Sequence, residues 1–111
     1  VLSALRQLTG GRLIVVFGVL GDKKYGAMVK MLCSLADELI ITTPKTERSV
    51  SPAVLLAVAR DYGVKTDVVE NPSDALKEAM AAADADDLIC VTGSLYLVGE
   101  IRGLLSGDRV D

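Results

Sequence analysis

Short runs of apolar and β-branched residues recur along the chain and predict the strands of a sheet that is buried on both faces. Sequence of helical character follows each run, and this alternation is typical of right-handed crossovers that carry helices onto a parallel sheet. The predicted strands are residues 13–17, 38–42, 66–69 and 87–92. We therefore predict an α/β fold with an open, mostly parallel, Rossmann-like sheet and helices on both faces.

Two predicted helices begin at a polar residue followed by proline, a combination that caps a helix and fits its first turn. The helix after Ser51-Pro52 should end at Gly63, and its apolar residues repeat at helical spacing at Leu55, Val58, Ala59 and Tyr62. The helix after Asn71-Pro72 should carry on one side Leu76, Ala79, Met80 and Ala83, before residues 84–87 return the chain to solvent.

Three further helices are predicted. Residues 3–8 predict a short helix, and residues 95–105 predict the last helix of the chain. Another helix should begin shortly after Gly21-Asp22, and its apolar residues at helical spacing are Tyr25, Met28, Val29, Leu32 and Ala36. A helix before the first strand is unusual, since such helices normally connect two parallel strands. We therefore expect the sheet to lack its first strand, upstream of Val1, and the chain to be a fragment of a longer protein.

The composition indicates a single domain over residues 1–111, with 50% apolar and 24% charged residues. Its net charge of −3, with scattered lysines and arginines, argues against nucleic-acid binding. The longest uncharged stretch, residues 88–99, is too short for a membrane helix. The absence of histidine excludes Ser-His-Asp chemistry within the chain. Cys33 and Cys90 lie in apolar stretches typical of buried free thiols, without disulfide or zinc spacing.

The loops that leave the carboxyl ends of the strands are the candidate ligand-binding positions, since open parallel sheets bind ligands there. The first, residues 18–24 (GVLGDKK), leads into a helix whose N-terminal amides favour an anion, and its glycines permit close backbone approach. It lacks the spacing of a P-loop. Asp22 fits a helix cap as well as a ligand contact, Lys24 fits a solvated side chain better, and Lys23 is the better candidate for a contact.

The loop after the last strand lies within residues 91–100 (VTGSLYLVGE). Ser94 stands where an N-cap would, and its hydroxyl and the neighbouring amides could bind a carboxylate or phosphate. On these residues alone a plain helix cap is favoured over a ligand contact, and Tyr96 fits packing better than binding. Two other strand exits are weaker candidates. Residues 43–49 fit a surface loop better than a lid, and residues 70–72 fit a turn followed by a helix cap.

Two stretches carry a resemblance to a known family: residues 16–25 (VFGVLGDKKY) and, more specifically, residues 91–100. They resemble the C-terminal domain of folylpolyglutamate synthase and dihydrofolate synthase, members of the Mur ligase superfamily. The resemblance implies a cytosolic enzyme that uses ATP and Mg²⁺ to join glutamate to folate or dihydropteroate through an acyl phosphate. It also implies that Ser94 helps to hold the incoming glutamate, and that Asp22 and Lys23 approach the site where the domains close.

The sequence departs from the family in what it omits. The family's Asp-Gly-Ala-His-Asn-Pro segment would precede Val1, and the P-loop and magnesium-binding carboxylates belong to the family's N-terminal domain. The isolated chain is therefore expected to be inactive, with no catalytic or metal-binding residue of its own. Three other readings stay open: a Mur ligase that adds an amino acid to a cell-wall precursor, a non-catalytic module that binds nucleotide or phosphate, and a purely structural domain.

Overall fold

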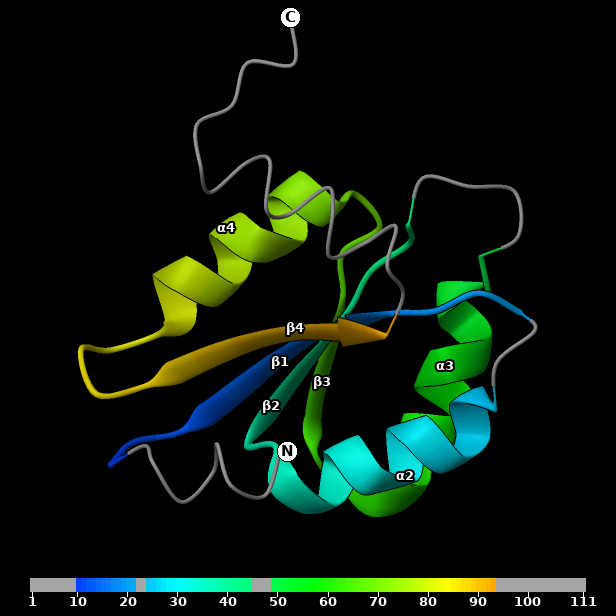
Figure 1. The fold of residues 1–111 in the computed structure, drawn as a ribbon, viewed down its shortest axis with the longest axis horizontal. Helices are drawn as coiled ribbons and strands as arrows, with labels where there is room; N and C mark the ends of the chain where they lie inside the picture. The colour runs from blue at the N-terminus through cyan, green and yellow to red at the C-terminus, as the bar shows by residue number, and fades with distance from the viewer. Residues whose placement is uncertain (1–9, 22–23, 45–48, 94–111) are drawn as a thin grey trace, which may run out of the picture.

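In the computed structural model, residues 10–21, 24–44 and 49–93 are described, and their strands form one parallel sheet in the order β3-β2-β1-β4 (Figure 1). The elements along the chain are β1 (Leu13–Gly18), α2 (Tyr25–Leu35), β2 (Glu38–Ile41), α3 (Pro52–Ala59), the 3-10 helix η1 (Arg60–Tyr62), β3 (Lys65–Val68), α4 (Pro72–Ala82) and β4 (Leu88–Gly93). This architecture confirms the predicted α/β fold. The helices predicted at residues 3–8 and 95–105 lie outside the described residues.

Helices cover both faces of the sheet, and the connections decide which face each helix covers. α2 and α3 lie on one face and α4 on the other (Figure 1). The chain steps in one direction from β1 to β2 to β3, whereas the connection from β3 to β4 steps back past β2 and β1. Because crossovers between parallel strands are right-handed, reversing the step places α4 on the opposite face.

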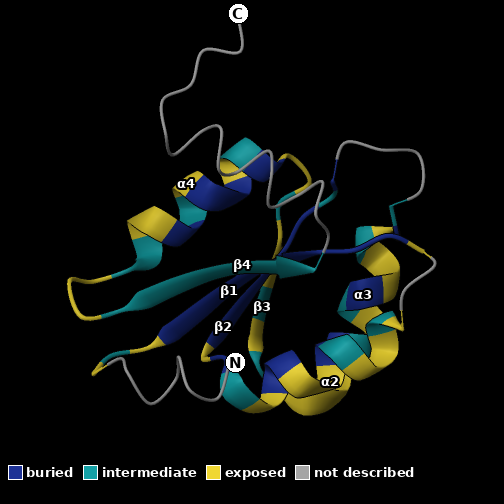
Figure 2. Ribbon diagram, in the orientation of Figure 1, coloured by how far each residue is buried: buried dark blue, intermediate teal, exposed yellow. Residues whose placement is uncertain are grey.

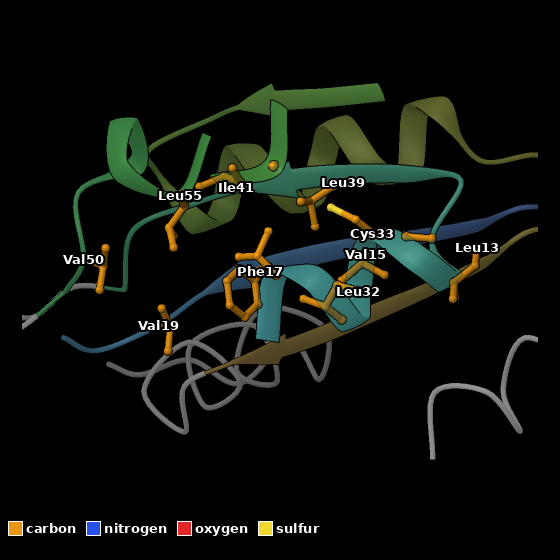
Figure 3. Close-up of a cluster of buried hydrophobic side chains, with 13 residues drawn as sticks. Leu13, Val15, Phe17, Val19, Leu32, Cys33, Leu39, Ile41, Val50 and Leu55 are labelled. Atoms are coloured by element: carbon orange, nitrogen blue, oxygen red, sulfur yellow. The ribbon is translucent and has the colours of Figure 1, made fainter. Parts of the chain in front are cut away.

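β1 lies at the centre of the core, with a paired strand on each side and helices over both faces. All six of its residues are buried (Figure 2). Leu13, Val15 and Phe17 face α2 and α3 (Figure 3), whereas Ile14 and Val16 face α4. A strand buried on both faces requires an uninterrupted apolar run, which is the feature that predicted it.

The ends of α3 follow the predicted signals, but its last turn does not. Ser51 caps α3, since its hydroxyl accepts a hydrogen bond from the Ala53 amide (3.3 Å), and Gly63 ends the segment with a φ of 72°. Between them, η1 tightens the helix, and the change of pitch turns Tyr62 away from the core. Tyr62 is 43% exposed, so grouping it with the buried Leu55 by helical spacing was wrong.

α4 begins at the predicted cap, where Asn71 Oδ1 accepts hydrogen bonds from the amides of Ser73 (2.8 Å) and Asp74 (3.4 Å). Its buried stripe is centred on Ala75 and Ala79, whose small side chains pack against the sheet. Met80 falls outside this stripe and is 56% exposed, so its predicted place on the packed side is wrong.

Both cysteines are free, Cys33 in the core and Cys90 half-buried on β4, and burial raises the pKa of both thiols. This agrees with the interpretation of the cysteines as small apolar residues. Within the described ranges, no helix is long and apolar enough to cross a membrane.

Arg12 and Asp87 form an ionic cluster that links the amino ends of β1 and β4. The Asp87 carboxylate accepts hydrogen bonds from the Arg12 and Asp84 amides (both 2.8 Å) and from the Arg12 guanidinium (2.9 Å), which also donates to the Ala82 carbonyl (2.6 Å). These amides and the guanidinium lower the pKa of Asp87 to about 2. The side chain of Asp87 is 5% exposed, so the expected return of residues 84–87 to solvent is wrong for this residue.

Replacing Asp87 with asparagine should lower stability and flatten its acid dependence. The carboxyl has a pKa of about 2 when folded and roughly 3.9 when unfolded. Its contribution is therefore complete above about pH 4 and is lost as the pH falls towards about 2. Urea unfolding across this interval should show that the wild type takes up about one more proton on unfolding than Asp87→Asn does.

Asp61→Asn is the matched control, since Asp61 is exposed on η1. It should keep the pH dependence of the wild type. If Asp87→Asn also keeps that dependence, the ionic cluster does not stabilise the fold through the Asp87 carboxylate.

Candidate functional site

The strand order changes direction between β1 and β4, whose carboxyl ends lie side by side. β1 connects through α2 to β2, which pairs with one side of β1. β4 pairs with the other side of β1 and follows α4, which lies on the opposite face of the sheet. The connecting helices α2, after β1, and α4, before β4, therefore lie on different faces of the sheet. In open α/β sheets, ligands bind at such a switch point. Topology thus selects two of the strand exits considered from sequence.

β1 and β4 both end in a glycine. Gly18 and Gly93 form the last pair between β1 and β4. A Cβ on Gly93 would overlap the carbonyl oxygen of Gly18, and the φ of 119° at Gly93 belongs to a region that side chains disfavour. Gly18 is equally confined, because a Cβ there would lie 2.7 Å from the Thr42 carbonyl oxygen. Both strands therefore end in a residue without a side chain, where the two backbones are closely packed.

The three predicted site residues follow these strand ends but lie outside the described residues. Asp22 and Lys23 come directly after Gly21, and Ser94 comes directly after Gly93. The structure brings together the chain segments that carry them, since Gly18 pairs with Gly93. Their roles stay predictions.

The N-terminus of α2 opens at the same edge of the sheet. Lys24 is the N-cap residue and makes no capping hydrogen bond with its side chain, and the first turn contains no acidic residue. Free amides and a helix dipole favour an anion at such a terminus. Lys24 is exposed, which agrees with its interpretation as a solvated side chain.

The β2 exit contributes residues that sequence reasoning did not select. Thr42 Oγ1 donates a hydrogen bond to the Glu70 carbonyl (2.9 Å), whereas Thr43 Oγ1 is buried without a hydrogen-bond partner among the described residues. Ser49 Oγ donates to the Pro44 carbonyl (2.6 Å), and Ser49 also bridges to Leu20 in the β1 exit. No local motif marks Ser49 or Thr43 as special, because their partners are distant in sequence or are backbone groups.

The β3 exit is a turn that ends in a helix cap, as predicted. The Glu70 carbonyl accepts a hydrogen bond from the Thr43 amide (3.0 Å), and Asn71 caps α4. Across the described ranges, no group of three or more acidic or cysteine side chains is placed to hold a metal ion.

The sheet order and the helices on both faces define a Rossmann-like α/β domain in which β1 and β4 meet at a switch point. Residues 1–95 match the family described as the Mur ligase, glutamate ligase domain, and the chain belongs to this family. The resemblance drawn from residues 16–25 and 91–100 is thereby confirmed.

Relatives of two kinds share this domain. A probable bifunctional folylpolyglutamate synthase/dihydropteroate synthase of Halobacterium salinarum is 40% identical over 92 residues, covering 82% of this chain and 11% of that protein. A UDP-N-acetylmuramoyl-L-alanyl-D-glutamate--2,6-diaminopimelate ligase 1 of Clostridium acetobutylicum is 36% identical over 109 residues, covering 93% of this chain and 22% of that protein.

A solved structure shares the fold. The bifunctional folylpolyglutamate synthase/dihydrofolate synthase from Yersinia pestis, complexed with AMPPNP and a Mn ion, superposes with a TM-score of 0.76 at 24% identity, covering 95% of this chain and 24% of that chain. The chain therefore spans between 11% and 24% of the length of these three proteins. The family comprises ligases, and the solved relative binds a nucleotide and a metal ion.

Replacing Gly93 with alanine tests the close approach of β4 to β1. The new Cβ would overlap Gly18 and strain the backbone, so urea unfolding should show a loss of at least about 2 kcal/mol in the free energy of unfolding. Gly26→Ala is the matched control, since nothing lies within 4 Å of its Cβ position on α2. It should leave stability unchanged or raise it by up to about 1 kcal/mol. A Gly93→Ala chain as stable as the wild type would contradict this geometry.

Proposed function

We propose that the chain is the glutamate-binding, C-terminal part of an ATP-dependent ligase that joins glutamate to folate or dihydropteroate through an acyl phosphate. The observation that carries the proposal is the pairing of the carboxyl ends of β1 and β4, in a domain whose family is described as a glutamate ligase domain. The 40% identity to a folylpolyglutamate synthase relative supports the folate substrate.

The proposed contacts follow the two strand ends. Ser94 would donate a hydrogen bond to a carboxylate of glutamate from its place directly after Gly93. Asp22 and Lys23 would lie in the loop that meets the nucleotide-binding domain when the two domains close. The N-terminus of α2, whose first turn contains no acidic residue, adds a positive electrostatic potential at the same edge, which favours an anionic substrate.

ATP and Mg²⁺ are the proposed cofactors of the full-length enzyme. The relative from Yersinia pestis holds AMPPNP and Mn, which supports a nucleotide and a divalent ion. Among the described residues, no group of three or more acidic or cysteine side chains is placed to hold the metal, so we assign no step through it to them. An N-terminal P-loop domain would hold both cofactors, and the isolated chain would be inactive.

A second candidate function is a Mur ligase that adds an amino acid to a cell-wall precursor. The 36% identity to a diaminopimelate ligase favours it. Both candidate functions place an amino acid beside the carboxyl ends of β1 and β4, and they differ in the acceptor molecule. Assaying the full-length protein with a folate and with a muramoyl peptide separates them. A non-catalytic phosphate-binding module predicts no ligation with either acceptor.

Replacing Ser94 with alanine in the full-length enzyme tests the proposed glutamate contact. Loss of a hydroxyl that binds a charged ligand should lower kcat/KM for glutamate by an amount equivalent to about 1.5 to 3 kcal/mol, with little change in the KM for ATP. Steady-state kinetics with glutamate and ATP varied separately measures both effects.

Ser34→Ala is the control, since Ser34 is exposed on α2 and its hydroxyl donates only to the Met31 carbonyl, one turn earlier. It should keep the wild-type constants. A Ser94→Ala enzyme with unchanged glutamate kinetics but a lower melting temperature would identify Ser94 as a helix cap instead.

A further inference from the structure

A group of charged side chains lies between α4 and the sheet, near the amino ends of β2 and β3. Asp67 pairs in register with Ile40, which packs on the α4 side, so Asp67 faces the same side of the sheet. Glu38 and Lys65 form the pair two residues earlier along the same strands and therefore face α4 as well.

Glu78 approaches this group from α4. Ala75 and Ala79 form the buried stripe of the helix, and Leu76 packs beside that stripe against Val91 of β4. Helical spacing places Glu78 on the other side of the stripe, towards β2 and β3. Its Oε2 atom is buried and has no hydrogen-bond partner among the described residues.

The positive charges near Glu78 pair with other carboxylates. Lys65 Nζ lies 3.7 Å from Glu38 Oε1, and the Arg12 guanidinium lies 3.9 Å from Glu38 Oε2 and 2.9 Å from Asp87 Oδ2. Within the described ranges, Glu78 itself forms no ion pair. β1 and β4 contribute only apolar side chains and glycine to this face. The charged groups that face Glu78 from the strands or flank it on α4 are Glu38, Lys65, Asp67, Asp74 and Lys77.

Glu78 and Asp67 cannot bond to each other while both are ionised, because a carboxylate oxygen only accepts hydrogen bonds. Burial and the repulsion between two neighbouring negative charges both favour the retention of one proton. Accordingly, burial and then the charge of Asp67 raise the pKa of Glu78.

From this arrangement we propose that Glu78 and Asp67 share one proton, which makes the contact between α4 and β3 a pH-sensitive link. The Glu78 carboxyl takes the proton from solvent and donates it in a hydrogen bond to the Asp67 carboxylate. The folded chain thus holds this proton more tightly than the unfolded chain. The stabilisation is complete below the unfolded pKa of glutamate, about 4.3, and is lost as the pH rises through the folded pKa of Glu78. It does not depend on the proposed function.

Urea unfolding of Glu78→Gln, Asp67→Asn and Glu70→Gln between about pH 4.5 and about pH 8 tests the link. The midpoint of the wild type should fall across this interval relative to that of Glu78→Gln, whose amide can donate to Asp67 at every pH. Asp67→Asn should lose most of the same pH dependence. Glu70→Gln is the matched control, since Glu70 is exposed in the turn before α4, and it should follow the wild type. Asp87, with a pKa of about 2, stays ionised in the folded chain throughout.

Carbon-13 NMR of the side-chain carboxyls follows the proton in the wild type itself, whether or not a variant folds. The Glu78 carboxyl should titrate at a higher pH than that of Glu70, and Asp67→Asn should move the Glu78 titration to lower pH. A Glu78 carboxyl that titrates together with that of Glu70 overturns the inference. An Asp67→Asn chain that keeps the whole pH dependence of the wild type overturns it as well.

Discussion

β1 and β4 run side by side to their last pair, Gly18 and Gly93, where the lack of side chains lets the two backbones meet. This approach is the constraint on which the proposed site depends. A larger residue at either glycine would push the strand ends apart, and the loops that follow would no longer start from one point. Because β1 is buried on both faces, it cannot shift to absorb the displacement.

The two ends of the sheet carry different kinds of interaction. At the amino end, Arg12 and Asp87 satisfy each other and the neighbouring backbone, and Glu38 lies between Arg12 (3.9 Å) and Lys65 (3.7 Å). At the carboxyl end, the Thr43 hydroxyl is buried and has no hydrogen-bond partner among the described residues, and the side chain of Lys24 does not cap α2. The amino end is therefore held by ion pairs, and Glu38 Oε2 there is buried without a hydrogen-bond partner among the described residues, as Thr43 Oγ1 is at the other end.

The sequence predicted the strands and helix starts because those depend on local signals: β1 on its apolar run, α3 and α4 on Ser51-Pro52 and Asn71-Pro72. It misplaced Tyr62 and Met80, since helical spacing does not show where a helix tightens or which stripe faces the sheet. It also missed the role of Asp87, whose partner Arg12 lies 75 residues earlier in the chain.

The candidate site was predictable only in part. Gly93 and the loop after β1 were selected because strand exits bind ligands, but sequence gives no strand order, and only the order β3-β2-β1-β4 shows that these two exits adjoin. No sequence motif predicted the contacts of Ser49, since its partners are the Pro44 carbonyl and the backbone of Leu20.

A crystal structure of the full-length protein with a non-hydrolysable ATP analogue and L-glutamate would test the central claim directly. The account predicts that glutamate lies between the β1 and β4 exits, against the backbone of Gly18–Gly21 and Gly93. Glutamate bound at the amino end of the sheet beside Arg12, or bound without contact to this domain, would contradict it.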